Sequence, residues 1–81
     1  MNTKLYEQVK GILVESLSLK EDEIKPESHL INDLGINSLE LADLVFRCED
    51  EFDIEIDEKA TSKFATVADV VEYLDGIVNV K

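Results

Sequence analysis

The sequence contains few of the residues that most often act in catalysis or form disulfide bonds. Its 81 residues include one cysteine (Cys48), one histidine (His29), one proline and no tryptophan. A single cysteine excludes an internal disulfide and is typical of a reducing compartment, so we expect a cytoplasmic protein. Serine hydrolysis needs a histidine base and an oriented acid, and His29 stands in a segment with no supporting motif. The sequence therefore predicts a protein that is not an enzyme.

Basic residues are also scarce. Eight Lys and Arg residues stand against 19 Asp and Glu, which gives a net charge of −11. The basic footprint of a nucleic-acid-binding protein is missing. The same charge disfavours anionic membranes and favours basic protein patches, and no apolar run is long enough to span a bilayer. We expect a small, soluble, monomeric domain over residues 1–81, with neither nucleic acid nor membrane as a partner.

Apolar residues at helical spacing predict three main helices, over residues 3–17, 38–52 and about 67–78. The first is expected to be capped by Asn2 or Thr3 and to end near Ser18. The last begins with a capping box from Thr66 to Asp69, and Gly76 is expected to fray its end. Asp57 is expected to cap a short helix from Glu58 to Ser62. Residues 53–57 alternate polar and apolar, but no partner strand exists, so we predict an extended linker.

Residues 18–37 form a long connection without a sustained period. We expect a short helical turn near residues 20–23 and an ordered loop held against the helices by apolar side chains, namely Ile24, Leu30, Ile31, Leu34 and Ile36. The predicted fold is all-α: a four-helix bundle of three main helices and one short helix, with a long loop between helices one and two.

The helix predicted over residues 38–52 has two apolar faces. Leu41, Leu44, Val45, Cys48 and Phe52 fall on one face, which we interpret as the core stripe. Leu39, Ala42 and Phe46 form a second stripe, bordered by Glu40, Asp43, Arg47 and Asp50. Between residues 38 and 58, nine acidic residues stand against Arg47 alone. Most charge runs are simply solvated, but this one borders an apolar stripe, which favours a docking surface for a basic partner.

Ser38 is predicted at the start of this acidic helix, as its N-cap or in its first turn. Free backbone N–H groups and the positive end of the helix dipole suit a phosphate there. Asp53, Glu55 and Asp57 have the odd spacing of a calcium loop. Glu58 and Phe64, however, replace the glycine and the terminal glutamate of that loop, so we predict no metal site.

The stretch Asp33-Leu34-Gly35-Ile36-Asn37-Ser38-Leu39, the acidic helix through Phe52 and the following Asp53-Ile54-Glu55-Ile56 resemble the acyl carrier protein family. The resemblance covers almost the whole chain. It implies that Ser38 receives 4′-phosphopantetheine from coenzyme A through a phosphopantetheinyl transferase. The thiol of this arm would then carry acyl groups as thioesters.

The resemblance also implies a surface for acyl synthases and transferases with basic docking patches. The residues of that surface would be Leu39, Glu40, Asp43, Phe46, Arg47, Glu49 and Asp50. A cavity for the acyl chain would be lined by Leu44, Val45, Cys48 and Phe52. The family's fatty-acid and lipid pathways are the expected setting.

Four residues depart from the common fatty-acid carrier pattern: Asn37, Phe46, Arg47 and Cys48. They leave open a specialised carrier for polyketide, peptide or other acyl synthesis. A second alternative, from a different functional class, is an acidic helical adaptor without a prosthetic group, in which Ser38 only caps its helix.

Overall fold

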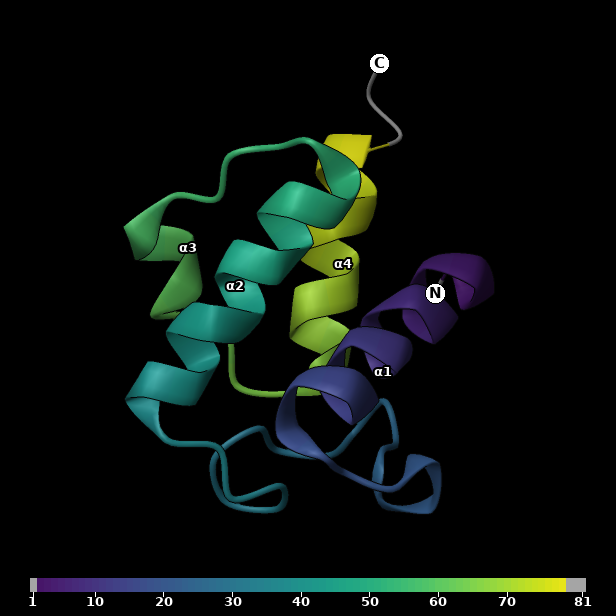
Figure 1. Ribbon diagram of the computed structural model, residues 1–81. Coiled ribbons are helices and arrows are strands. Elements are labelled where there is room, and N and C mark those ends of the chain that lie inside the picture. Colours follow the sequence, from purple (N-terminus) through teal and green to yellow (C-terminus); the bar gives the residue numbers. More distant parts are fainter. Residues whose placement is uncertain (1, 79–81) are drawn as a thin grey trace.

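The structure is a computed structural model that describes residues 2–78, in which helices are joined by turns and loops (Figure 1). The elements in chain order are α1 (Thr3–Leu17), a 3₁₀ turn η1 (Glu21–Glu23), α2 (Ser38–Phe52), α3 (Glu58–Thr61) and α4 (Val67–Val78). The predicted all-α bundle with a long loop between its first two helices is thereby confirmed. The predicted turn near residues 20–23 is present as η1.

Helix α1 is the central packing element, because it contacts both α2 and α4. It begins at the predicted cap, where the Asn2 side chain accepts a hydrogen bond from the Leu5 N–H at 3.1 Å. The Asn2 amide also donates to Asp75 Oδ1 at 3.1 Å, which ties the start of α1 to the last turns of α4. It ends at Ser18, which has the left-handed conformation (φ 56°) common at helix ends.

The long loop is fastened to the start of α4 by backbone hydrogen bonds. Leu30 N–H donates to the Ala65 carbonyl at 2.8 Å, and Val67 N–H donates to the Ser28 carbonyl at 3.1 Å. Ile24, Leu30 and Ile36 are buried in the core as predicted, and Leu34 packs against it. The prediction for Ile31 was wrong, because half of its surface is exposed on the outer side of the turn that contains it.

Residues 54–57 form neither helix nor strand, as predicted for a linker, but Asp53 is the left-handed C-cap of α2 (φ 54°) and is not extended. The Asp57 side chain accepts from the Lys59 N–H at 2.9 Å and caps α3, which ends at Thr61, one residue before the predicted end. The capping box of α4 is confirmed: Asp69 N–H donates to Thr66 Oγ1 at 3.2 Å and Thr66 N–H to Asp69 Oδ2 at 3.0 Å. The expected fraying at Gly76 was wrong, because α4 is continuous to Val78.

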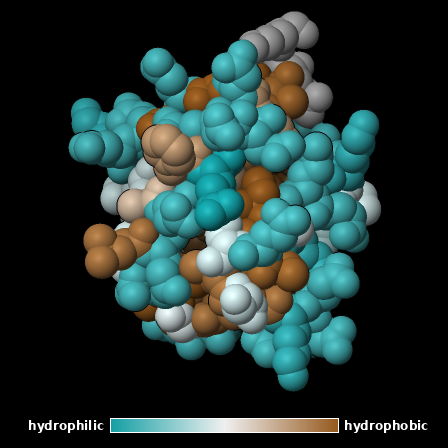
Figure 2. All heavy atoms as spheres, in the orientation of Figure 1, coloured by the Kyte–Doolittle hydropathy of each residue, from teal (hydrophilic) through white to brown (hydrophobic). Residues whose placement is uncertain are grey.

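Apolar atoms reach the surface among hydrophilic side chains on the side of the molecule where α2 lies (Figure 2). Leu39 and Phe46 of α2 are the most exposed large apolar residues in the described chain, at 81% and 69%. Across residues 2–78, no helix combines the length and apolarity needed to cross a membrane.

Candidate functional site

The start of α2 is built by a bend and a cap that precede Ser38. Gly35 has a positive φ of 70°, a conformation that costs glycine little, and the buried Ile36 anchors the chain after the bend. Asn37, not Ser38, is the N-cap: its side chain accepts from the Glu40 N–H at 2.8 Å. The Glu40 carboxylate in turn accepts from the Asn37 N–H at 3.1 Å. Ser38 is therefore the first residue of the helix, which decides between the two positions predicted for it.

This arrangement leaves Ser38 available. Its side chain is exposed, and within residues 2–78 its hydroxyl has no hydrogen-bond partner. The capping box satisfies the N–H groups of Asn37 and Glu40 but not those of Ser38 and Leu39, which have no acceptor in the described chain. Two backbone donors without acceptors and an exposed serine thus lie at the positive end of a 15-residue helix.

Ser38 lies at the rim of an open groove of about 500 Å³ between α2 and α3. Its α2 wall carries Leu41, Ala42, Val45, Phe46 and Glu49, and its opposite wall carries Ile56, Glu58, Thr61 and Ser62. The centre of the α2 wall is apolar. The groove therefore places an apolar surface directly beside the exposed hydroxyl.

The four residues predicted to line an acyl cavity are not brought together in one hollow. Only Val45 lines the groove beside Ser38. Leu44 and Cys48 are closed within the core, and Phe52 lines a separate hollow of about 260 Å³ against the start of α1. The sequence predicted that the whole apolar stripe of α2 lines one cavity. On the helix, however, Leu44 and Cys48 are turned toward the core, whereas Leu41 and Val45 are turned toward α3.

The acidic residues predicted to meet partners differ in how free they are. Glu40 is engaged in the cap, and Glu49 Oε2 accepts from the Ile56 N–H at 2.7 Å. Asp43 is paired with Arg47, Nε to Oδ2, at 3.1 Å. Asp50 is exposed and has no hydrogen bond or ion pair with another described residue. These internal roles were missed from the sequence, although the three-residue spacing of Asn37 and Glu40 could have indicated the cap.

The second apolar stripe has the predicted exposure. Leu39, Ala42 and Phe46 are all exposed on the side of α2 away from the core. Their role as a contact surface stays a prediction.

A family model described as "phosphopantetheine attachment site" matches residues 7–74. The chain belongs to this family. Domains of this family are the attachment site for a 4′-phosphopantetheine prosthetic group, so the protein is a phosphopantetheine-bearing carrier. Such carrier domains are generally non-catalytic, and they interact with phosphopantetheinyl transferases and acyl-handling enzymes.

The carrier has one thiol of its own, and that thiol is enclosed. Cys48 is fully buried on the core side of α2. Burial, with smaller contributions from the Glu51 and Glu49 carboxylates, raises the pKa of the Cys48 thiol to about 12. A neutral, inaccessible thiol is a poor nucleophile.

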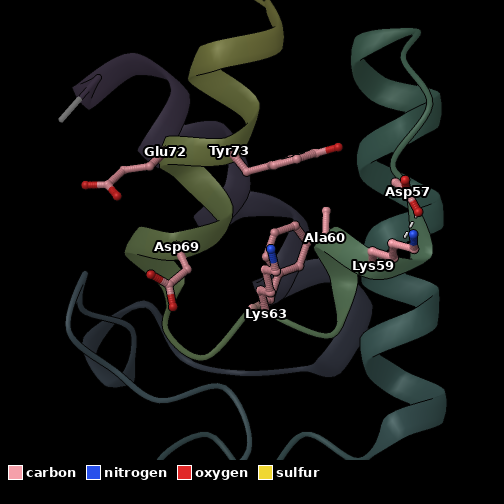
Figure 3. Close-up of a pocket in the computed structure, with 8 residues that line it drawn as sticks. Asp57, Lys59, Ala60, Lys63, Asp69, Glu72 and Tyr73 are labelled. Atoms are coloured by element: carbon pink, nitrogen blue, oxygen red, sulfur yellow. Dashed lines mark hydrogen bonds between the residues drawn. The ribbon is translucent and has the colours of Figure 1, made fainter.

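A larger hollow of about 590 Å³ lies between α3 and α4, away from Ser38 (Figure 3). Two of its carboxylates are engaged: Asp57 caps α3, and Asp69 Oδ2 accepts from the Ala65 and Thr66 N–H groups, each at 3.0 Å. These backbone hydrogen bonds, from Thr66 and then Ala65, lower the pKa of Asp69 below its ordinary value. Glu72 of α4 is the third acidic residue that lines the hollow, and its side chain is exposed. The engaged acids of this hollow thus stabilise helix starts.

His29 also has a structural setting. Its backbone N–H donates to Asp33 Oδ2 at 2.7 Å, and its Nδ1 accepts from the Asn32 N–H at 3.1 Å. These bonds close the turn that precedes α2. Among the described residues, no group of three or more His, Cys, Asp or Glu is placed to hold a metal ion.

Proposed function

We propose that Ser38 is the attachment residue and that the protein carries acyl intermediates as thioesters between partner enzymes. Three observations at one place support this assignment. The Ser38 hydroxyl is exposed, the adjacent Ser38 and Leu39 N–H groups lack acceptors within residues 2–78, and an apolar groove opens beside them. The first of these carries the proposal, because a transferase can modify only a hydroxyl that it can reach.

The start of α2 fits a phosphodiester on physical grounds. A phosphate linked to Ser38 would lie next to two unpartnered backbone donors and the positive end of the helix dipole. Asn37 and Glu40 hold this turn in place without using either donor. When attached, 4′-phosphopantetheine supplies a flexible arm that ends in a thiol on which an acyl group is held as a thioester.

The chain's own contribution to cargo handling is the groove between α2 and α3. Leu41, Ala42 and Val45 offer an apolar wall next to Ser38, and the groove volume is about 500 Å³. Covering an apolar chain there would remove its surface from water, which is favourable by about 25 cal/mol per Å². The groove therefore favours aliphatic or aromatic cargo.

Partner enzymes would approach the exposed face of α2. Leu39 and Phe46 supply apolar contact area at its centre, and Asp50 supplies a free negative charge beside them. A phosphopantetheinyl transferase and acyl synthases or transferases with basic patches fit this surface. Family membership favours this carrier function over the acidic adaptor without a prosthetic group.

We place the protein in the cytoplasm, in fatty-acid, lipid or a related acyl pathway. Its one cysteine fits a reducing compartment. The exposed Phe46 and the Asp43–Arg47 pair on the docking face favour a specialised partner set, which keeps polyketide, peptide or other acyl synthesis as alternatives.

The test is attachment of the arm by a broad-specificity transferase supplied with coenzyme A and magnesium. Intact mass spectrometry should show the gain of one phosphopantetheine in the wild type and none in Ser38→Ala. Ser62→Ala is the matched control, because Ser62 lines the same groove and is also exposed; this variant should gain the full mass. An unmodified wild type, or a modified Ser38→Ala, would overturn the assignment.

A further inference from the structure

Arg47 interrupts the acidic surface of α2. It is the only basic residue between residues 38 and 58, and its Nε lies 3.1 Å from Asp43 Oδ2, one helical turn earlier. Both side chains remain about half exposed, at 52% and 49%. The guanidinium is therefore paired with Asp43 on one side and accessible to a partner protein on the other.

The position of Arg47 places it at one edge of the docking face. At 100° per residue, Leu39, Phe46 and Asp50 occupy the centre of the exposed side of α2. Ser38 and the groove lie on the α3 side of that centre. Arg47 lies on the opposite side, where it lines a small hollow with Ile12 and Glu15 of α1 and with Asp50 and Glu51 of α2. An enzyme seated over Phe46 and reaching Ser38 would thus have Arg47 at its other edge.

The acidic side chains that such an enzyme would meet differ in how their carboxylate oxygens are engaged. Asp43 is paired with Arg47, whereas Glu40 and Glu49 keep their negative charge but each has one carboxylate oxygen that accepts a backbone hydrogen bond. Asp50 remains as a free acid near the centre of the face. The face therefore combines an apolar centre and several negatively charged side chains with a single half-exposed cation at its rim.

We propose that Arg47 is a specificity-determining residue, which selects enzymes that place a carboxylate opposite it and disfavours enzymes whose docking patch is basic throughout. The inference rests on the proposed function, since it concerns partners of the same carrier. A partner lysine brought against the guanidinium would face a like charge in a partly desolvated contact. A partner carboxylate can instead make a charge-assisted hydrogen bond to the exposed N–H groups.

A purely structural role for Arg47 gives a different expectation. Asp43, Glu15, Asp50 and Glu51 surround it, so it also relieves repulsion among acids. Loss of that role would lower the thermal midpoint of unfolding, but it would not make the effect depend on the charge of a partner. The test therefore needs a readout that varies with the partner.

The probe is a broad-specificity phosphopantetheinyl transferase with a basic carrier-docking patch. Its affinity is measured in a Ser38→Ala background, so that binding does not depend on attachment. Arg47→Glu should tighten the Kd about threefold to fivefold, the effect expected of one exposed charge pair, and Arg47→Gln less. Raising the salt concentration should reduce this gain. Lys20→Glu makes the same charge change at an exposed site outside α2 and should leave the Kd within about twofold of the parent value.

The second arm varies the transferase. Each Lys or Arg of its patch is changed to Glu and tested against Arg47 and Arg47→Glu in a double-mutant cycle. At least one change should reverse the preference, so that the carrier with Arg47 binds more tightly. Circular dichroism at the binding temperature checks that each variant is folded. If Arg47→Glu unfolds, the same double-mutant cycle is measured with Arg47→Gln.

Two results would overturn the inference: a gain for Arg47→Glu no larger than that for Lys20→Glu, or additivity at every position of the patch. The absence of any binding would overturn the docking face and this inference with it. Binding in the Ser38→Ala background, together with no mass gain in the protein that retains Ser38, would overturn the attachment residue alone.

Discussion

The side chains of Asn37 and Glu40 each accept a hydrogen bond from the other residue's backbone N–H, at 2.8 and 3.1 Å. This reciprocal pair encloses the first turn of α2 and leaves Ser38, which lies between the two residues, with an unengaged hydroxyl. Capping and attachment are thus divided between neighbouring residues, and each can be tested by its own substitutions.

Replacement of the cap should destabilise the protein. Asn37→Ala removes the acceptor for the Glu40 N–H and should lower the free energy of unfolding by about 1 kcal/mol. Asn37→Asp keeps a side-chain oxygen and adds a negative charge at the helix start, so its stability should equal or exceed that of the wild type. Urea unfolding followed by circular dichroism measures both. Equal stability of Asn37→Ala and the wild type would show that the cap is dispensable.

Glu40 contributes both a cap and a charge, and two substitutions separate them. Glu40→Gln keeps an oxygen that can accept from the Asn37 N–H, so the free energy of unfolding should change by less than about 0.5 kcal/mol. Glu40→Lys removes the acceptor and places a cation at the positive end of the helix, so it should destabilise by about 1 kcal/mol. Weakened transferase binding in Glu40→Gln, at unchanged stability, would identify a contact that depends on charge. Identical unfolding of the two variants would contradict the capping role.

The Cys48 thiol should be unreactive in the folded protein. Because Cys48 is fully buried and its pKa is raised to about 12, iodoacetamide at pH 8 should leave it unmodified in buffer and alkylate it in denaturing urea. Intact mass after a fixed reaction time measures the difference. Rapid alkylation without denaturant would mean that the core around α2 opens readily.

The same thiol should make stability depend on alkaline pH. The unfolded thiol ionises near 9, whereas the folded thiol stays neutral up to about 12. Above pH 9 the unfolded state binds fewer protons, so this group should lower stability by up to about 1.4 kcal/mol per pH unit. Unfolding of the wild type and Cys48→Ala between pH 8 and 11 measures this as a difference in slope. Parallel pH profiles would contradict it.

Asp69 should stabilise the connection between α3 and α4. Its carboxylate accepts two backbone hydrogen bonds, so Asp69→Ala should cost about 1–2 kcal/mol and Asp69→Asn less. The pKa of Asp69 is lowered in the folded state, so its contribution is complete above pH 3.8 and is lost as the pH falls below that value. The advantage of the wild type over Asp69→Asn should therefore shrink on acidification. An advantage that stayed constant down to pH 2 would argue against this assignment.

The sequence predicted the helices well because local signals coincide at their ends. Asn2, Asp57 and Thr66 each precede a helical period, and each proved to be a cap. The predicted fraying at Gly76 failed because intrinsic preference is weak evidence near an end that tertiary contacts hold, and Asp75 there bonds to Asn2.

The site was less predictable, because helical spacing predicts which residues share a face of a helix but not which element packs against that face. It placed Leu44 and Val45 in one stripe, but only the position of α3 decides that Val45 lines the groove while Leu44 is closed in the core. Likewise, Glu49 accepts a hydrogen bond from the backbone of Ile56, seven residues away. This bond depends on the turn after α2, and helical spacing does not predict the geometry of that turn. Acidic residues on the surface of a helix thus look equivalent in the sequence, although their hydrogen bonds and ion pairs differ in the structure.

The most direct test of the carrier assignment is mass spectrometry of the protein isolated from its native cell. Proteolysis followed by fragmentation of the peptide that contains Ser38 would locate the arm and identify any acyl group on its thiol. We expect phosphopantetheine on Ser38, with part of the population acylated. A native protein without the arm, or with the arm on another residue, would contradict it.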